Sequence, residues 1–281
     1  MAKIFSSTIC ALGEGPLWHP EEQVLYWFDI LGKRLYRSDG IDEQSWEFDE
    51  HVSAAGWVDT GVLLIASETA LSVFETATGE STYLHPLESD NPVTRSNDGR
   101  ADPWGGFWIG TMGKNAEPGA GAIYRYYDGT LTRLFDRITI SNAICFAPDG
   151  GHAFYTDTPK RKILRVALDD DGFPKGKPDL FVDLNAEGLN PDGAVVDADG
   201  NLWVAQWGAS RVACYGPDGT FLRAIDVPAR HTSCPAFGGA DLSMLYITSA
   251  TQGLDPAEKQ DGMTFMASTG ARGQKEHQII L

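Results

Sequence analysis

The sequence has few of the features that mark redox, zinc-binding or membrane-embedded proteins. Its four cysteines are scattered at Cys10, Cys145, Cys214 and Cys234. No C-x-x-C pair occurs, which argues against a zinc knuckle or a redox dithiol. The longest clear apolar run covers only residues 61–66, far fewer than a membrane-spanning helix needs. The N-terminus shows neither the long apolar stretch nor the small-residue cleavage site of a secretory signal peptide. We therefore expect a cytoplasmic protein.

Basic residues are also scarce. The chain carries 22 Lys and Arg against 39 Asp and Glu, which gives a formal net charge of −17. Such a field repels a nucleic-acid backbone and an anionic membrane, so neither is expected as a partner. Two interpretations of the acidity stay open at this point. It maintains solubility, or part of it forms a carboxylate-rich pocket that attracts a cation.

Familiar catalytic motifs are missing as well. No G-x-S-x-G elbow of a serine hydrolase occurs, and no glycine-rich loop has the residues that complete a phosphate-binding motif. The six histidines form no pair at i, i+4, and we expect them in turns or on the surface. The eight tryptophans are expected to pack between structural units, with Trp207 a candidate to line the mouth of a site.

Helical periodicity is nearly absent, and strand-turn-strand units recur instead. Six such units occupy residues 17–28, 57–66, 100–109, 144–155, 194–204 and 236–247. A repeated four-stranded unit of roughly 40–50 residues is the pattern of a propeller blade, whereas a β-sandwich would lack this internal register. The sequence therefore predicts a single all-β domain over residues 1–281, a six-bladed β-propeller. We expect residues 252–262 to form a polar loop in the last blade, with one helical turn.

Polar side chains recur at one spacing ahead of four of these units. Glu14, Asn97, Asn142 and Asp192 each stand eight residues before the following turn residue. Since the first strand of each blade lies nearest the axis, these side chains are expected to form a ring at one end of the central channel. Two carboxylates and two amides, without sulfur or imidazole, suit a hard cation such as Ca²⁺, Mn²⁺ or Mg²⁺. The sequence thus predicts a central metal site.

A purely structural interpretation of these motifs competes with the site. Asn and Asp before Gly are ordinary turn formers, and blades two and six place Ser53 and Cys234 near the same register, so the ring is incomplete. The common spacing favours a site, because carboxylates facing each other on an axis repel unless a cation compensates them. Flanking glycines such as Gly15 and Gly193 fit a backbone that turns tightly to aim a carboxylate inward.

At these residues the sequence resembles the gluconolactonase and regucalcin (senescence marker protein) family of six-bladed propellers, from about residue 13 to about residue 265. The motifs that carry the resemblance are Gly13-Glu14-Gly15-Pro16, Arg95-Ser96-Asn97-Asp98-Gly99, Gly110-Thr111-Met112, Ser141-Asn142, Tyr155-Thr156-Asp157, Pro191-Asp192-Gly193 and Cys234-Pro235-Ala236-Phe237-Gly238-Gly239. The resemblance implies metal-dependent hydrolysis of an aldono-lactone such as glucono-, galactono-, xylono- or arabinono-lactone.

The resemblance also implies roles for single residues. It implies one divalent ion, with Ca²⁺ the first expectation and Mn²⁺, Mg²⁺, Zn²⁺ or Fe²⁺ the alternatives, bound by Glu14, Asn142 and Asp192. It implies that Arg95 binds the lactone, that Asn97 lies at the metal or touches the substrate, and that Glu117 meets the sugar. Ser96, between Arg95 and Asn97, leaves the sugar preference open.

A lactone hydrolase needs a polarised carbonyl, an activated water and a stabilised oxyanion. The ion provides the first and third as a Lewis acid, and Asp192 is the candidate general base. Two alternatives stay open: a phosphotriesterase-type hydrolase, and a non-catalytic calcium-binding propeller. Arg95 beside the ring favours an enzyme over a scaffold, although fold alone never establishes function. The expected partner is a small sugar lactone, and the expected state is a monomer or a small homo-oligomer.

Overall fold

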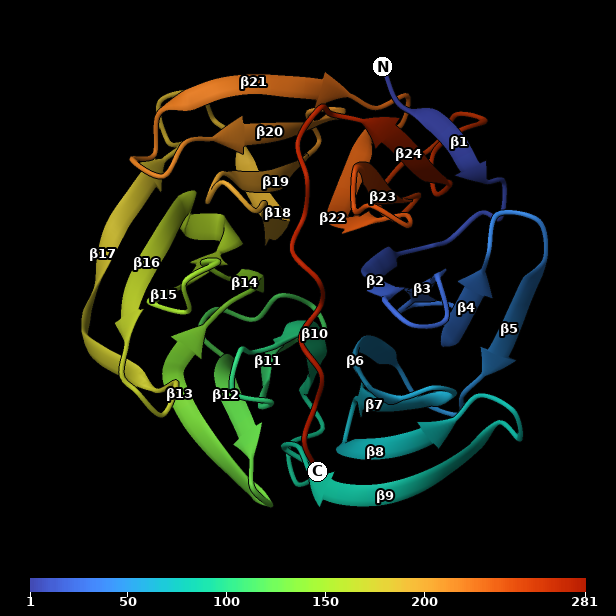
Figure 1. Ribbon diagram of the computed structural model, residues 1–281, viewed down its shortest axis with the longest axis vertical. Coiled ribbons are helices and arrows are strands. Elements are labelled where there is room, and N and C mark those ends of the chain that lie inside the picture. The colour runs from blue at the N-terminus through green and yellow to red at the C-terminus, as the bar shows by residue number, and fades with distance from the viewer.

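The computed structural model describes all 281 residues, which form six four-stranded antiparallel sheets arranged around a central axis (Figure 1). The predicted six-bladed, all-β propeller is confirmed. The first three blades comprise β2 (Gly13–His19), β3 (Val24–Asp29), β4 (Arg34–Ser38), β5 (Glu43–Glu47); β6 (Val52–Asp59), β7 (Val62–Ser67), β8 (Ala70–Glu75), β9 (Glu80–Pro86); and β10 (Thr94–Ala101), β11 (Phe107–Gly113), β12 (Gly121–Tyr127), β13 (Thr130–Ile138). The next two comprise β14 (Ser141–Phe146), β15 (His152–Asp157), β16 (Lys162–Leu168), β17 (Pro174–Asp183); and β18 (Asn190–Val196), β19 (Leu202–Trp207), β20 (Arg211–Tyr215), β21 (Phe221–Asp226).

The sixth blade joins the two ends of the chain. Its inner strands are β22 (His231–Gly238), β23 (Met244–Ala250) and β24 (Thr264–Ser268), and its outer strand is the N-terminal β1 (Lys3–Ser6). β1 pairs antiparallel with β24, with Ile4 opposite Phe265. Because the first strand completes the last blade, hydrogen bonds close the ring, and no blade is left with only three strands.

Large side chains fill the spaces between blades. Five of the eight tryptophans are buried, as expected of side chains that pack between structural units: Trp18, Trp27, Trp57, Trp108 and Trp203. Trp203 of β19 meets Phe237 of β22 edge to face, with ring centroids 5.9 Å apart, and this pair joins blades five and six. Such aromatic pairs add about 0.5–1.5 kcal/mol beyond the area that they bury. Packing of this kind between neighbouring blades holds the inner strands in place.

The inner strand of every blade contains a β-bulge close to its start. The pairing with the second strand shifts by one residue between Glu14 and Leu17, Val52 and Ala54, Ser96 and Gly99, Asn142 and Cys145, Pro191 and Ala194, and Thr232 and Pro235. A bulge bends the strand and re-aims the side chain beside it. Six bulges at one level therefore turn side chains of all six blades toward the same end of the channel.

The C-terminal segment, residues 269–281, crosses the ring as a tail without regular secondary structure (Figure 1). Ile279 N donates to Trp57 O at 2.8 Å, and Ile280 N donates to Gly105 O at 2.9 Å. Gln274 Nε2 donates to Val196 O at 3.0 Å. These carbonyls lie near or just beyond the ends of inner strands opposite the bulges described above, and β6 has a second shift in register between Trp57 and Asp59. The tail therefore covers the end of the channel opposite the predicted site.

Helix is limited to one short 3₁₀ turn, η1 (Thr158–Lys160), so no helix of the structure is long and apolar enough to cross a membrane. Residues 252–262 form the expected loop between β23 and β24, but they contain only turns and bends. The helical turn predicted there is wrong. His19 also differs from expectation, because it is fully buried at the end of β2, with Nε2 3.2 Å from Asp59 O.

Candidate active site

The four predicted ring residues meet in one cavity. Glu14, Asn97, Asn142 and Asp192 come from four different inner strands and are only 2–6% exposed. Together with Arg95 they line a cavity of about 590 Å³ at the bulged end of the channel. A volume of this size is typical of small-molecule sites. Five of the six predicted site residues are thus brought together, whereas their chemical roles stay predictions.

The four ring positions are not equivalent in strand register, although their spacing in the sequence is equal. Glu14 pairs with Phe28 and Asn142 with Thr156, so both stand directly before a bulge. Asn97 and Asp192 instead lie inside the bulge of their strand. The cause lies in the hairpin beyond each bulge. Counted from the first strand pair after the bulge, this hairpin is one residue longer in blades three and five than in blades one and four. The constant spacing of eight residues between ring residue and turn residue therefore includes two different strand registers.

Two different backbone features place these side chains. Gly15, after Glu14, has a left-handed φ of 53°, and Ala143, after Asn142, has a φ of 57°, so both residues adopt the conformation that glycine tolerates best. Gly193, after Asp192, has no such φ. A Cβ at Gly193 would lie 2.3 Å from Cys234 Sγ. The predicted reason for the glycines thus holds for Gly15, whereas Gly193 is required by close packing.

A chain of hydrogen bonds links Arg95 to the neutral members of the site. Arg95 Nη1 donates to Asn97 Oδ1 at 2.8 Å, and Asn97 Nδ2 donates to Asn142 Oδ1 at 3.1 Å. Asn142 Nδ2 donates to Thr158 Oγ1 at 2.9 Å, and this hydroxyl donates to Pro191 O at 2.8 Å. The chain runs through blades three, four and five. It fixes the amides of Asn97 and Asn142 and explains why the site tolerates their burial.

The carboxylates of the ring have weaker compensation, since the one hydrogen bond to Glu14 comes from Gly15 N, 3.2 Å from its Oε2. No ion pair joins Glu14 or Asp192 to a basic side chain, and Arg95 Nη1 is bonded to the neutral acceptors Ser96 O and Asn97 Oδ1. Burial raises the pKa of Glu14 to about 8, and the nearby charge of Asp98 adds to the effect. Burial also raises the pKa of Asp192 well above its ordinary value, with Glu14 and Asp98 adding to it. The protein alone therefore holds two acidic groups in an environment that disfavours their charge.

A divalent cation fits this arrangement. Glu14, Asn142 and Asp192 offer oxygen donors from three blades, and a hard cation would neutralise the two carboxylates that the protein leaves uncompensated. No group of three or more His, Cys, Asp and Glu side chains is arranged so that it could hold a metal ion without other donors. A set of three protein ligands at this site would therefore include an amide oxygen, a donor that suits Ca²⁺ better than a softer metal.

Glu117, the sixth predicted site residue, does not line the cavity. Its carboxylate accepts from Asn115 N and Asn115 Nδ2, both at 3.0 Å. Asn115, together with Lys114 and Ala116, forms the part of the β11–β12 loop that does line the cavity. The structure thus places Glu117 as a support of this loop, and its contact with a sugar stays a prediction.

The sequence analysis missed an acidic neighbour and one wall of the site. Asp98 is buried beside Asn97, and its Oδ2 accepts from Ile144 N at 2.7 Å. His231 lines the cavity with Trp207, and their rings stack with centroids 4.2 Å apart. Trp207 thus lies where it was expected. His231 stands directly before the bulge of β22, just as Arg95 stands directly before the bulge of β10, and this register is known only from the structure.

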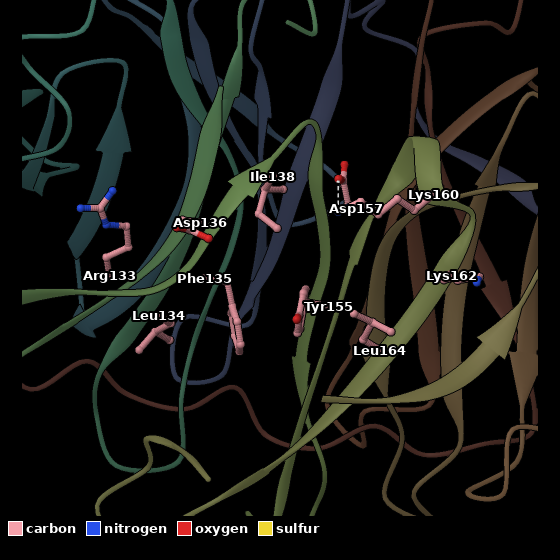
Figure 2. Close-up of a pocket in the computed structure, with 10 residues that line it drawn as sticks. All are labelled: Arg133, Leu134, Phe135, Asp136, Ile138, Tyr155, Asp157, Lys160, Lys162 and Leu164. Atoms are coloured by element: carbon pink, nitrogen blue, oxygen red, sulfur yellow. Dashed lines mark ion pairs between the residues drawn. The ribbon is translucent and has the colours of Figure 1, made fainter. Parts of the chain in front are cut away.

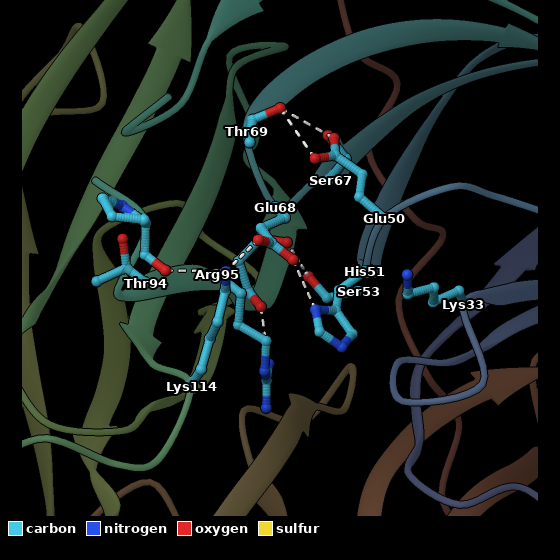
Figure 3. Close-up of polar contacts among 12 residues, drawn as sticks. Lys33, Glu50, His51, Ser53, Ser67, Glu68, Thr69, Thr94, Arg95 and Lys114 are labelled. Carbon is cyan, nitrogen blue, oxygen red and sulfur yellow. Dashed lines mark hydrogen bonds and ion pairs between the residues drawn. The ribbon is translucent and has the colours of Figure 1, made fainter. Parts of the chain in front are cut away.

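A polar cluster lies beside the cavity near blade two (Figure 3). Glu68 accepts hydrogen bonds from Lys114, which lines the cavity, and from His51 Nδ1 at 2.7 Å. Hydrogen bonding by these two side chains lowers the pKa of Glu68 despite its partial burial. Unlike Glu14, this carboxylate therefore has its own partners, and it holds Lys114 at the rim.

A second hollow, of about 510 Å³, lies on the outer part of blades three and four and contains none of the ring residues (Figure 2). Its floor is the stacked pair Phe135 and Tyr155, with centroids 4.4 Å apart. Lys160 Nζ, at its edge, lies 3.0 Å from Asp157 Oδ2. Its buried carboxylate, Asp157, thus has an ionic partner, unlike Glu14 and Asp192 of the axial cavity.

Comparisons with known proteins show the family to which the chain belongs. An L-arabinolactonase of Azospirillum brasilense is 38% identical over 283 residues, covering 97% of this chain and 93% of the relative. A 6-deoxy-6-sulfogluconolactonase of Pseudomonas putida is 35% identical over 255 residues, covering 89% and 87%. The crystal structure of a calcium-binding protein, regucalcin, from Agrobacterium tumefaciens superposes with a TM-score of 0.97 at 39% identity, covering 100% of this chain and 98% of that one. The family described as SMP-30/Gluconolactonase/LRE-like region matches residues 12–251, and the chain belongs to this family.

Proposed function

We propose that this protein hydrolyses a sugar lactone to its aldonic acid with one divalent metal ion held by Glu14, Asn142 and Asp192. The observation that carries the proposal is the pair of buried carboxylates without a basic partner in a cavity that also contains Arg95. The relatives from Azospirillum brasilense and Pseudomonas putida, both named as lactonases, support the same reaction class.

The bound ion would polarise the lactone carbonyl and lower the pKa of a water molecule. The residues of the chain supply the remaining functions. Arg95 uses Nη1 for Ser96 O and Asn97 Oδ1, so its other N–H groups stay available for a sugar hydroxyl or for the charge that develops on the carbonyl oxygen. Burial lowers the pKa of Arg95 to about 10, which leaves it protonated at neutral pH.

The cavity suits a monosaccharide lactone. Leu12, Met112, Ile140 and Trp207 give apolar surface for the C–H faces of a sugar, and Asn115 and Lys114 give polar groups for its hydroxyls. We propose the aldono-lactones, glucono-, galactono-, xylono- and arabinono-lactone, as the substrate class. Ca²⁺ is the first candidate for the ion because all protein donors are oxygens and because the related regucalcin structure is named as a calcium-binding protein.

The experiment is acid release from a panel of aldono-lactones at constant pH. The protein is stripped with a chelator and assayed bare and with Ca²⁺, Mn²⁺, Mg²⁺, Zn²⁺ or Fe²⁺ restored, and spontaneous hydrolysis is subtracted. We expect metal-dependent acid production well above that background. Asp192→Asn should lose metal binding in calorimetry together with activity, whereas Asp218→Asn, in an exposed outer turn, should retain both.

Two results would change the proposal. A protein that binds the ion and accelerates no lactone would be a calcium-binding propeller without this activity, or a hydrolase of phosphotriesters if it released fluoride from a phosphofluoridate. Full turnover by Asp192→Asn at saturating metal would remove Asp192 from the chemistry, including the general-base role predicted from the sequence.

A further inference from the structure

His231 and Arg95 occupy the same level on opposite walls of the cavity. Arg95 stands directly before Ser96, where the bulge of β10 begins, and His231 stands directly before Thr232, where the bulge of β22 begins. These strands are the innermost strands of blades three and six, which face each other across the axis of a six-bladed ring (Figure 1). Both side chains line the same cavity. A ligand bound over the ring residues would therefore lie between them.

The imidazole of His231 is held in one orientation. Its ring stacks on Trp207 with an interplanar angle of 23°, and Nδ1 lies 2.9 Å from Gln252 O. Because a carbonyl oxygen only accepts, Nδ1 carries a hydrogen in this contact. In the neutral ring the lone pair is then on Nε2, and no hydrogen bond of the chain occupies that atom.

The surroundings of His231 favour the neutral ring. Burial lowers the pKa of His231, and the neighbouring charge of Arg230 acts in the same direction. The hydrogen bond to Gln252 O and the charge of Asp261 oppose this shift without reversing it, and Asp261 Oδ2 is paired with Arg230 Nη2 at 2.6 Å. The other charged groups that face this wall are Glu258, 4.0 Å from Arg230, and the cavity residues Glu14, Arg95, Lys114 and Asp192. With the ring carboxylates neutralised by a cation, none of these groups holds a proton on the imidazole at neutral pH.

We propose that His231 is the general base that activates water in the lactone hydrolysis proposed above, on which this assignment rests. Asp192 is poorly suited to that task, because a carboxylate bound to a divalent cation is a weak base. A neutral imidazole with a fixed ring and a free Nε2 has the properties that general-base catalysis requires near neutral pH.

The proposed step is balanced in atoms and charge. Nε2 of His231 takes a proton from water while the water oxygen forms a bond to the lactone carbonyl carbon. The tetrahedral intermediate then breaks its bond to the ring oxygen, and the imidazolium returns the proton to that oxygen. The product is the open-chain hydroxy acid, which releases its carboxyl proton to solvent. Arg95, on the opposite wall, is placed to steady the negative charge that develops on the former carbonyl oxygen.

The test compares His231→Gln with His85→Gln in the full-length protein at saturating Ca²⁺. His85 is a matched control, because its Nδ1 also lies near a backbone carbonyl, Pro86 O at 2.8 Å, but it sits on the outer strand β9. The readouts are kcat and KM for the best lactone between pH 5 and 8, the Ca²⁺ affinity by calorimetry, and the thermal midpoint.

We expect His231→Gln to lower kcat by about 100-fold or more, the usual effect of losing a general base, with KM and Ca²⁺ affinity within about threefold of the wild type. The wild-type protein should lose activity as the pH falls through the pKa of His231, and this acid limb should be absent in the variant. His85→Gln should retain wild-type activity. If His231→Gln misfolds, His231→Ala takes its place, and added imidazole should restore part of its turnover.

Each failure has a separate meaning. A wild-type protein that hydrolyses no lactone with any metal overturns the proposed function and this assignment together. An active wild type with an equally active His231→Gln overturns the assignment alone. A rise in KM at unchanged kcat makes His231 a binding residue only, and a loss of Ca²⁺ affinity in the variant makes it a support of the metal site.

Discussion

The acidic ring predicts that replacing one of its carboxylates stabilises the metal-free protein. Glu14 is buried, and burial raises its pKa from 4.5 to about 8. Between these two pH values the folded metal-free protein holds a proton on Glu14 that the unfolded chain has released. Folding stability therefore falls as the pH rises through this window. Glu14→Gln removes the titrating group and with it this loss.

The size of the effect follows from the shift. Each pH unit between the two pKa values corresponds to about 1.4 kcal/mol. The stability gained by Glu14→Gln should accordingly grow from about 1 kcal/mol near pH 5 to about 4 kcal/mol near pH 8. Other groups titrate in the same range, and His231 and His277 have lowered pKa values that act in the opposite direction. The difference between variant and wild type removes the contribution of the two histidines, whereas Asp192, whose pKa the charge of Glu14 raises, adds to the gain.

The assay is thermal or urea unfolding of chelator-treated protein between pH 5 and 9, repeated with Ca²⁺. Ca²⁺ should raise the midpoint of the wild type and leave Glu14→Gln unchanged. Glu117→Gln is the control, because hydrogen bonds from Asn115 lower the pKa of Glu117, so its removal should not stabilise the protein at pH 8. A metal-free Glu14→Gln less stable than the wild type at pH 8 would refute the reasoning, since the protein itself would then be compensating the carboxylate.

Two further changes test the packing around the site and at the far end of the channel. Ile279→Ala should cost about 2–5 kcal/mol, because this side chain is buried among the inner strands, whereas the neighbouring exposed Ile280→Ala should cost less than about 1 kcal/mol; equal thermal midpoints would show that the tail contributes nothing to the core. Gly193→Ala should cost about 1–3 kcal/mol through overlap with Cys234 and should weaken metal binding by displacing Asp192; calorimetry showing unchanged affinity would contradict this.

The convergence of the ring residues was predictable because it depends on repetition. Six similar units place their first strands around one axis, so the neighbourhood of Glu14 and Asp192 follows from the repeat alone. The side-chain types then indicate the chemistry. Equal spacing was enough to find the residues, but it did not reveal the two registers. In blades three and five the ring residue lies one position further into the bulge and the hairpin is one residue longer, so the spacing of eight residues is unchanged.

Other features depend on contacts between segments far apart in the chain, which no local pattern reports. β1 completes the last blade through pairing with β24, and its residues, KIFS, read as an ordinary short strand. The tail is held across the channel by backbone N–H groups that donate to the carbonyls of Trp57 and Gly105. His231 was expected in a turn or on the surface, because only the bulge register of β22 shows that it faces Arg95.

The two ends of the channel differ in whether a buried charged side chain has an ionic partner, and this difference supports the proposed location of the site. At the closed end the guanidinium of Arg100 is buried, and the tail supplies Glu276 as its ionic partner. An unpaired buried charge would cost several kcal/mol, so the fold uses its own chain to compensate it. At the open end Glu14 and Asp192 are equally buried, and Arg95, although close, is bonded to neutral acceptors. The C-terminal tail thus provides an ionic partner for Arg100, whereas no segment of the chain provides one for the two carboxylates. Because Glu14 and Asp192 have no ionic partner at the end that opens into a cavity, the divalent cation proposed above would supply the missing charge there.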